Sequence, residues 1–424
     1  AATVLIGDFA YDYFGCSVSD AGDLNGDGFG DVLIGAYGSD PTGAESGAAF
    51  VFLGTSAGIA SGNASSANAT LNGEWLGGLF GYSVSGAGDV NGDGYDDLVV
   101  GSHGDSENGD FAGKAFIFLG SQNGVTGGDA SAVGSTLVGE LPYDQFGHSV
   151  SGAGDVNGDG FDDVVLGAWG RDTNGSNSGA AYVFLGTAAG ILPGDVNMAH
   201  AVWNGDSAYD NFGLRVADAG DINGDGFADI IVGAPFCNSY EGSAFVFLGS
   251  AAGLSSGVAS LADTVLSGGS PSDFFGTSVA GAGDVNGDGF DDVIVGSVEA
   301  YTGQFAGAAH IYLGSDVGIS SGISSSSDSA LVGESGGDFF GSSVAAAGDV
   351  NGDGFDDILV GAYDDDNYGL RSGTAFVFLA EPPPCPDNDG DGFTDAACGG
   401  VDCNDSEGTS FPGAAELPCD GLDN

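Results

Sequence analysis

The chain has 424 residues, of which 61 are acidic and only four are basic, and its formal net charge is −57 at neutral pH. This charge excludes nucleic acid and anionic membrane surfaces as expected partners. Hydrophobic residues make up 42% of the sequence, which is enough for a sizeable core, and no stretch of about 18 apolar residues predicts a membrane span.

One unit recurs along the chain, and its first loop aspartate falls at positions 23, 89, 155, 221, 284 and 349. Each unit opens with a Phe-Gly pair in the pattern FGxSVxxAGD. It continues through an acidic loop into segments such as DVVLGA, GAAYVFLG and ATLNG. These apolar segments lie between Gly, Asn, Asp and Ser, which predicts four short antiparallel strands per unit. Six such units predict an all-β fold, a six-bladed β-propeller of four-stranded blades over residues 1–380.

The two ends of the repeat array predict how the ring closes. Residues 373–380 (GTAFVFLA) form a third strand with no fourth strand after it, whereas residues 2–7 (ATVLIG) resemble the fourth-strand segments STLVG and SALVG. We therefore expect the N-terminal strand to complete the sixth blade and close the ring, which removes a free strand edge. Residues 381–384 (EPPP) predict a stiff linker, and residues 385–424 a small, irregular module rich in Cys and Asp.

Each acidic loop carries oxygen-bearing side chains at positions 1, 3, 5 and 9, a glycine at position 6, and an aromatic residue at position 7 that can offer its carbonyl oxygen. Carboxylate, amide and carbonyl oxygens together suit Ca²⁺ better than Mg²⁺. A solvated acidic turn is the alternative, but the pattern recurs six times at one register. An EF-hand is rejected because it needs Glu at position 12 between two helices. The predicted ligands are Asp23, Asn25, Asp27, Phe29, Asp31, Asp89, Asn91, Asp93, Tyr95, Asp97, Asp155, Asn157, Asp159, Phe161, Asp163, Asp221, Asn223, Asp225, Phe227, Asp229, Asp284, Asn286, Asp288, Phe290, Asp292, Asp349, Asn351, Asp353, Phe355 and Asp357.

The pattern FGxSV…GDxNGDGxxDxxxGA resembles the FG-GAP repeat of integrin α-subunit propellers and their bacterial relatives over residues 1 to about 380. The resemblance implies calcium in the loop between the first and second strands of each blade, and ligand recognition on the opposite face. The sequence departs from integrins because it has six repeats rather than seven, every loop is intact and no adhesion domain is inserted. The integrin ligand site is therefore not transferred residue by residue.

The C-terminal module repeats the loop spacing in DNDGDGFTD. This segment predicts at least one more Ca²⁺ site, and the module resembles part of a MopE-type metal-binding repeat and the thrombospondin type 3 calcium repeat. Four cysteines predict disulfides, whose pairing the sequence leaves open, and a secreted or cell-surface location. The predicted ligands are Asp387, Asp389, Asp391, Phe393 and Asp395, and the disulfide candidates are Cys385, Cys398, Cys403 and Cys419.

The loops between the second and third strands (the 2–3 loops) and those between consecutive blades (the 4–1 loops) should share the face opposite the calcium loops. Varied loops on a repeated scaffold are where recognition usually lies, although their aromatic residues could instead cap the blade cores. Arg215 replaces a serine on the innermost strand, either as a buried counter-charge or as part of the channel lining. The ligand-face candidates are Tyr37, His103, Trp169, Arg171, Tyr363 and Arg371.

These features favour a non-enzymatic, calcium-binding adhesion or recognition module that binds a protein or glycan ligand, with self-association as a further partner class. A lectin, a self-assembling surface subunit and an FG-GAP-bearing lyase or hydrolase remain alternatives. Catalysis finds little support because no nucleophile elbow, zinc motif or phosphate-binding glycine loop is present in the sequence.

Overall fold

The computed structural model describes residues 3–298, 306–366 and 372–380. The predicted linker at 381–384, the module at 385–424 with its cysteines and its acidic loop, and Arg371 all lie outside the described residues. Strands dominate the described part, and its α-helices are the single turns α1 (Ala130–Val133) and α2 (Cys237–Tyr240). No helix in these ranges is long and apolar enough to cross a membrane.

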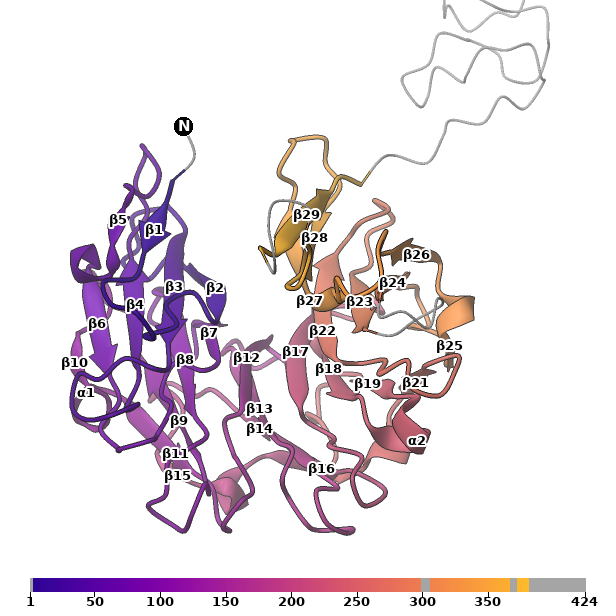
Figure 1. Cartoon of the computed structure of the whole chain (residues 1–424), viewed down its shortest axis with the longest axis horizontal. Coiled ribbons are helices and arrows are strands. Elements are labelled where there is room, and N and C mark those ends of the chain that lie inside the picture. The colour runs from indigo at the N-terminus through magenta and orange to yellow at the C-terminus, as the bar shows by residue number, and fades with distance from the viewer. Residues whose placement is uncertain (1–2, 299–305, 367–371, 381–424) are drawn as a thin grey trace, which may run out of the picture.

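The strands form six blades around a common centre, which confirms the all-β, six-bladed propeller (Figure 1). Blade one contains β2 (Val18–Gly22), β3 (Asp31–Ala36), β4 (Ala48–Phe52) and β6 (Ala69–Asn72). Blade two contains β7 (Val84–Gly88), β8 (Asp97–Ser102), β9 (Lys114–Phe118) and β11 (Ser135–Val138). Blade three contains β12 (Ser149–Gly154), β13 (Asp163–Ala168), β14 (Ala180–Phe184) and β16 (Ala201–Asn204). Blade four contains β17 (Arg215–Gly220), β18 (Asp229–Ala234), β19 (Ser243–Phe247) and β21 (Thr264–Ser267).

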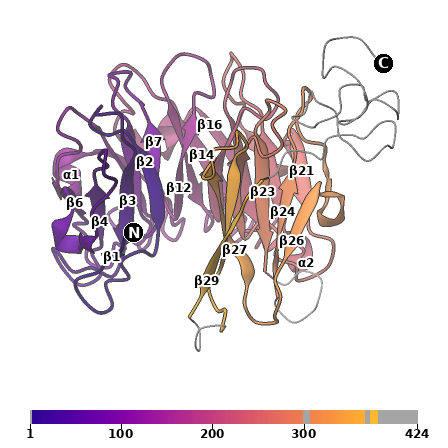
Figure 2. The same cartoon turned by 90° about the horizontal axis from the view of Figure 1, so that it is seen from above.

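Blades five and six complete the array. Blade five contains β22 (Ser278–Gly283), β23 (Asp292–Ser297), β24 (Ala308–Tyr312) and β26 (Ser329–Val332). Blade six contains β27 (Phe340–Gly348), β28 (Asp357–Ala362) and β29 (Thr374–Phe378). The strands of the blades stand side by side and the connecting loops gather at two opposite ends of the molecule (Figure 2).

The first four blades also carry a short fifth strand, which the sequence did not predict. It comes from the following repeat and pairs in parallel with the fourth strand of the blade before it. These strands are β10 (Gly128–Asp129), β15 (Gly194–Asp195), β20 (Gly257–Val258) and β25 (Gly322–Ile323).

The Phe-Gly pairs link one blade to the next. Phe146 is fully buried and packs edge-on against Tyr182 and Phe184 of its own blade. Its backbone bridges to Gly113 of blade two. Gly113 has a φ of +85°, and a Cβ there would lie 2.1 Å from the Phe146 carbonyl oxygen, so only glycine fits this junction.

The structure corrects the expected closure of the ring. The N-terminal strand β1 (Leu5–Ile6) pairs with β5 (Gly62–Asn63), and among the described residues β29 pairs only with β28. Blades one and six accordingly stand apart in Figure 1. Apolar side chains at both free edges remain in solvent, with Val4 57% and Val377 53% exposed.

The N-terminal segment nevertheless has the contacts of a fourth strand, and those contacts hold it on blade one. The Val4 amide donates to Ser61 Oγ at 2.9 Å, as the Val202 amide of the true fourth strand β16 donates to Ser256 Oγ at 3.0 Å. Asp8 accepts from the Ser65 amide at 2.7 Å. The N-terminal segment therefore does resemble a fourth strand, as the sequence indicated. Its partner, however, is β5 of the first repeat and not β29 of blade six.

Candidate functional site

The acidic loops join the first and second strands of each blade, as the sequence predicted. In blade three, both carboxylate oxygens of Asp155 accept backbone N–H groups, including those of Asp159 at 3.1 Å and Gly160 at 2.7 Å. Asn157 Oδ1 accepts from the Asp159 amide at 2.8 Å, and Asp159 Oδ1 accepts from the Phe161 amide at 3.1 Å. Short side chains at alternate positions thus satisfy the N–H groups of a tight turn that has no strand partner.

The aspartate at position 9 is more deeply buried than the side-chain ligand candidates at positions 1, 3 and 5. Asp163 is fully buried, and its two oxygens accept from the amides of Val156 at 3.1 Å and Gly186 at 2.8 Å. This carboxylate therefore ties the 1–2 loop to the end of the third strand of the same blade. The same pair of bonds recurs at Asp31, Asp97, Asp229, Asp292 and Asp357.

The electrostatics of the loops favour a cation. Burial, and then the nearby carboxylates of Asp155 and Asp159, raise the pKa of Asp163 to about 7 even though two amide donors lower it. The same causes raise the pKa of Asp97, Asp229 and Asp292 to about 7. Negative charges therefore lie close enough to oppose each other's ionisation.

The donor set of each loop fits a hard cation. The donors are carboxylate, amide and carbonyl oxygens. Each carboxylate oxygen has about two lone-pair sites, so the oxygens of Asp163 retain accepting capacity beside their amide donors. Within the described ranges, no three His, Cys, Asp or Glu side chains come together as a metal centre, because the loop carboxylates turn toward backbone amides. The chemistry of the donors is suitable, while their convergence on one ion remains a prediction.

A further loop carboxylate, at position 8, joins neighbouring blades and was missed by the sequence reasoning. Asp96 Oδ2 accepts from the Asp23 amide of the preceding blade at 2.6 Å, and Asp162 Oδ2 accepts from the Asp89 amide at 2.8 Å. Asp291 and Asp356 make the same bond to Asp221 and Asp284. The recurrence of Asp at this position, interrupted only by Gly30 and Ala228, was the signal that could have revealed it.

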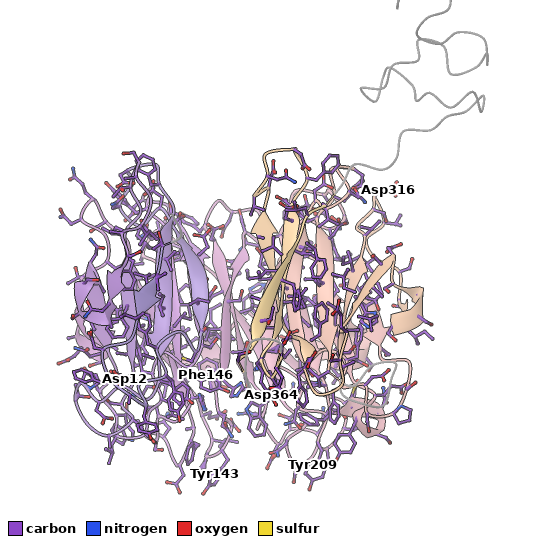
Figure 3. All side chains as sticks on the ribbon, turned by 45° about the horizontal axis from the view of Figure 1, so that its top comes forward. Asp12, Tyr143, Phe146, Tyr209, Asp316 and Asp364 are labelled. Carbon is purple, nitrogen blue, oxygen red and sulfur yellow. The ribbon has the colours of Figure 1, made fainter. Side chains whose placement is uncertain are left out.

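Three of the ligand-face candidates, Tyr37, His103 and Trp169, come together at the centre of the opposite end. Figure 3 shows Tyr143 and Tyr209, from 4–1 loops, at one end of the molecule and Asp316, from a 3–4 loop, at the other. Near the propeller axis, Tyr82, His103, His148 and Trp169 form what we call the central cluster. The ring centroids of Tyr82 and His103 are 4.5 Å apart, those of His103 and His148 5.0 Å, and those of His148 and Trp169 6.0 Å.

Tyr37 extends the central cluster toward blade one. Its ring lies 5.4 Å from that of Tyr82 and stacks on Tyr13 at 4.7 Å. Sequence reasoning selected Tyr37, His103 and Trp169 but missed Tyr82 and His148. These two residues occupy the variable position of the FGxS pattern, which also holds Cys16, Leu214, Thr277 and Ser342.

The other ligand-face candidates have separate surroundings. Arg171 forms ion pairs with Asp144 at 2.8 Å and Glu140 at 3.4 Å, so its charge is already compensated. Tyr363 stacks on Phe339 in blade six, with their ring centroids 5.0 Å apart.

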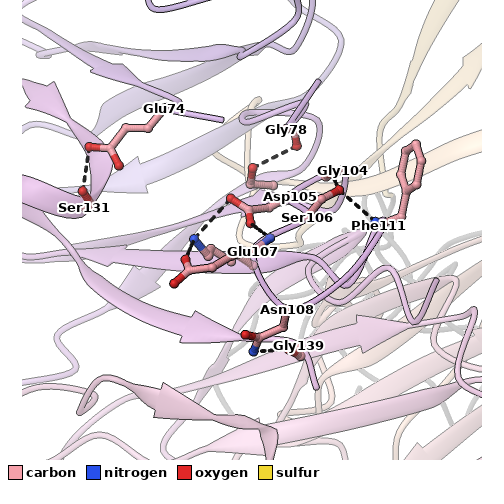
Figure 4. A network of polar contacts seen from close by, with 12 residues as sticks. Glu74, Gly78, Gly104, Asp105, Ser106, Glu107, Asn108, Phe111, Ser131 and Gly139 are labelled. Atoms are coloured by element: carbon pink, nitrogen blue, oxygen red, sulfur yellow. Dashed lines mark hydrogen bonds and ion pairs between the residues drawn. The ribbon is translucent and has the colours of Figure 1, made fainter. Parts of the chain in front are cut away.

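The 2–3 loop of blade two, which carries His103, is fixed by its own polar contacts (Figure 4). Lys114 pairs with Asp105 at 3.3 Å and with Glu107. Asn108 Nδ2 donates to the Gly139 carbonyl oxygen at 3.0 Å, and Ser106 Oγ accepts from the Phe111 amide at 3.0 Å. A variable loop held in this way can present His103 in a defined position.

Burial keeps the histidines of the central cluster neutral. It lowers the pKa of His103 from 6.5 to about 4, and burial together with the charges of His103 and Arg215 lowers the pKa of His148 well below its usual value. Three buried nitrogens, His103 Nδ1, His148 Nδ1 and Trp169 Nε1, have no hydrogen-bond partner in the described part of the chain. Buried polar atoms of this kind are rare and often mark a place where water or a ligand binds.

Comparison with known proteins agrees with this architecture. The FG-GAP repeat model matches residues 17–52, 80–118, 146–184, 215–247, 275–312 and 340–378, which is just over half of the sequence. The chain belongs to the FG-GAP repeat family.

Its relatives include integrin alpha-5 of Xenopus laevis, which is 33% identical over 226 residues that cover 51% of this chain and 20% of the relative. Integrin alpha-IIb of Homo sapiens is 36% identical over 170 residues, or 39% of this chain and 16% of the relative. The chain thus spans a fifth or less of the length of these relatives. Sqt1 from Chaetomium thermophilum, a solved structure, is 13% identical over 85% of this chain and 70% of its own, with a TM-score of only 0.35.

Substitution of Asp163 should separate the structural role of position 9 from the other loop positions. In metal-free buffer, Asp163→Ala should lower the free energy of unfolding by about 2–5 kcal/mol, because two buried N–H groups lose their acceptor. The exposed Asp159→Ala should lower the free energy of unfolding by less than about 1 kcal/mol, because water replaces the lost acceptor. Asp163→Asn retains one acceptor oxygen, so its loss should lie between those of the two alanine variants. Urea unfolding measures all three, and equal losses for Asp163→Ala and Asp159→Ala would contradict the assignment.

The buried state of His103 should appear as a pH dependence. Its pKa is lowered in the folded state, so the stability that neutral His103 contributes is complete above pH 6.5 and is lost as the pH falls toward about 4. The raised pKa values of the position 9 aspartates make the folded state more stable as the pH falls, which opposes the effect of His103. The variant His103→Phe retains these aspartates, so a comparison with it isolates the contribution of His103. The stability of the unmodified protein relative to this variant should fall by about 2 kcal/mol between pH 7 and pH 5. A constant difference would show that His103 is solvated.

Proposed function

We propose that this chain is an extracellular, calcium-binding adhesion or recognition module without enzymatic activity, and that it binds a protein ligand on the face of its 2–3 and 4–1 loops. The observation that carries the proposal is the contrast between the two ends of one propeller. One end repeats the same acidic loop six times, whereas the other end gathers residues that differ from blade to blade at its centre. The relationship to integrin alpha subunits supports adhesion and a protein partner.

Calcium has a structural part in this proposal. Position 1, 3, 5 and 9 side chains and the position 7 carbonyl of each propeller loop would hold one ion, and the loop of Asp387, Asp389, Asp391, Phe393 and Asp395 would hold at least one more. A bound divalent cation supplies positive charge among carboxylates that otherwise oppose each other's ionisation. The loops would then hold the first two strands of each blade together and leave the opposite end free for recognition.

The location follows from the same considerations. Calcium at millimolar concentration is available outside cells, where calcium modules bind with dissociation constants of roughly 10⁻⁴–10⁻³ M. The relationship to integrin alpha subunits supports a secreted or cell-surface location. We further propose that the four C-terminal cysteines form disulfides in that oxidising environment.

Binding measurements with two tryptophan variants test the proposal. Trp169→Ala should weaken capture on immobilised matrix proteins by about 2 kcal/mol or more, because large aromatic residues at the centre of an interface contribute most of its affinity. Trp75→Ala is the matched control: it removes an indole that is 41% exposed and lies over Lys114, outside the central cluster. Capture should require Ca²⁺ and disappear in EDTA.

The outcomes distinguish the alternatives. A parallel glycan array with and without EDTA reports lectin activity. Binding to glycans alone would replace the protein-binding proposal. Unchanged capture by Trp169→Ala would place the ligand away from the central cluster, and unchanged capture by both variants would place it on another face of the molecule.

A further inference from the structure

Arg215 interrupts a contact that the inner strands of blades one, two and three make with the next blade. The equivalent positions hold Ser17, Ser83, Ser149, Ser278 and Ser343. Ser83 Oγ accepts from the Val150 amide of the next blade at 3.0 Å, and Ser149 Oγ accepts from the Val216 amide at 3.0 Å. A guanidinium accepts no hydrogen bond, so blade four gives up this link to blade five at the position of Arg215.

Arg215 also lacks the acidic partner that the other described basic residues have. Lys114 and Arg171 each pair with two carboxylates. No carboxylate within the described residues pairs with Arg215, whose Nη1 donates to the carbonyl oxygen of the adjacent Leu214 at 2.9 Å. In a chain with 61 acidic residues, an arginine that none of the described carboxylates compensates is a strong departure from the surrounding pattern.

The side chain of Arg215 lies at the central cluster. It interacts electrostatically with Tyr82 and His148, which belong to blades two and three, although Arg215 itself begins the inner strand of blade four. Burial lowers the pKa of Arg215, yet the residue keeps partial exposure. The backbone of Leu214 provides a common point of contact, because Arg215 Nη1 donates to its carbonyl oxygen and the His148 imidazole also bonds to it.

The nitrogens without partners lie in the same place. Trp169 Nε1 is a donor only, and a neutral imidazole can carry its proton on Nδ1, so His103 and Trp169 can both donate. The imidazole of His148 already makes a hydrogen bond to the backbone of Leu214. Together with the guanidinium, His103 and Trp169 form a donor-rich centre in a chain whose net charge is strongly negative. Such a centre is complementary to an oxyanion.

The packing of the central cluster favours a narrow ligand. The rings of Tyr82 and His103 meet at an angle of 69°, those of His103 and His148 at 64°, and those of His148 and Trp169 at 84°. His103 and His148 are only 7% and 8% exposed. Rings that cover each other edge to face offer no broad platform for stacking a sugar, whereas a single side chain from a loop requires much less open surface.

We propose that Arg215, with His103 and Trp169, binds the carboxylate of an Asp or Glu side chain on a loop of a protein partner. This inference rests on the proposed function and names the group that the partner presents. The planar guanidinium binds carboxylates through two parallel hydrogen bonds. Because the net charge of −57 repels acidic surfaces, the partner loop carries its acidic residue among neutral or basic neighbours.

Two matched peptides test the site in the full chain. The probes are Ac-Gly-Asp-Gly-NH₂ and its amide counterpart Ac-Gly-Asn-Gly-NH₂, and galacturonate and galactose form a second pair. The readout is the indole N–H resonance of each of the three tryptophans in ¹⁵N-labelled protein, with Trp169 assigned from Trp169→Phe. The aspartyl peptide should shift the Trp169 resonance in a saturable manner, and the asparaginyl peptide should not.

Arg215→Ser is the decisive variant because it restores the residue that the other five inner strands contain. It should fold with an unchanged or higher melting temperature, since a serine hydroxyl at this position can accept from the Val279 amide of the next blade. It should also weaken aspartyl-peptide binding by about tenfold or more. An unchanged Trp169 resonance, equal effects of both peptides, or unchanged binding by Arg215→Ser would overturn the proposal. So would a response to galacturonate without a response to the aspartyl peptide.

The result is independent of the test of the proposed function. If peptide binding depends on Arg215 but no matrix protein is captured through this face, the carboxylate site stands and the adhesion function fails. If capture requires Trp169 but is unchanged in Arg215→Ser, the adhesion function stands and the carboxylate site fails.

Discussion

The structure depends on carboxylates that accept hydrogen bonds from backbone amides of the loops. Each blade turns sharply between its first two strands, and the N–H groups in that turn have no strand to pair with. Asp155 and Asp163 satisfy amides within their own blade, and Asp162 satisfies one in the blade before it. The arrangement places several negative charges close together. Burial, together with the repulsion between these charges, raises the pKa of Asp163, and the concentration of negative charge makes each loop suitable for a cation. The same side chains thus shape the loops and make them ready to bind metal.

Much of this could be predicted from the sequence because it repeats. The strand segments, the loop positions and the propeller follow from local patterns that recur at a fixed register, as at Asp155, Asn157 and Asp159. The position 8 bond of Asp162 and the central cluster were missed because they depend on which residues of neighbouring blades face each other. The prediction that the N-terminal strand closes the ring was wrong for a related reason. Residues 4–8 do have the contacts of a fourth strand, but the likeness between strands does not state which edge finds a partner, and β1 is held on blade one by β5.

The two ends of the propeller have different relations to the repeat. At the loop end every blade follows the same pattern, and a change such as Ala228 in place of Asp removes one bond between neighbouring blades. At the other end the variable FGxS and 2–3 loop positions meet at the axis, so residues that look unrelated in sequence become neighbours. Tyr82, His103, His148 and Trp169 come from two blades, and Arg215 comes from a third. A repeated scaffold can therefore carry a single asymmetric site even though its repeats differ from one another at only a few positions.

The central claim is that the acidic loops are metal sites as well as hydrogen-bonded turns, and the most direct measurement is the number of Ca²⁺ ions bound by the intact chain. Native mass spectrometry or equilibrium dialysis at millimolar Ca²⁺ should find six ions for the six propeller loops and at least one more for the C-terminal loop. The melting temperature should rise as these sites fill, because ligands that bind only the folded state stabilise it. No bound calcium, or a melting temperature that is the same in Ca²⁺ and in EDTA, would contradict the account.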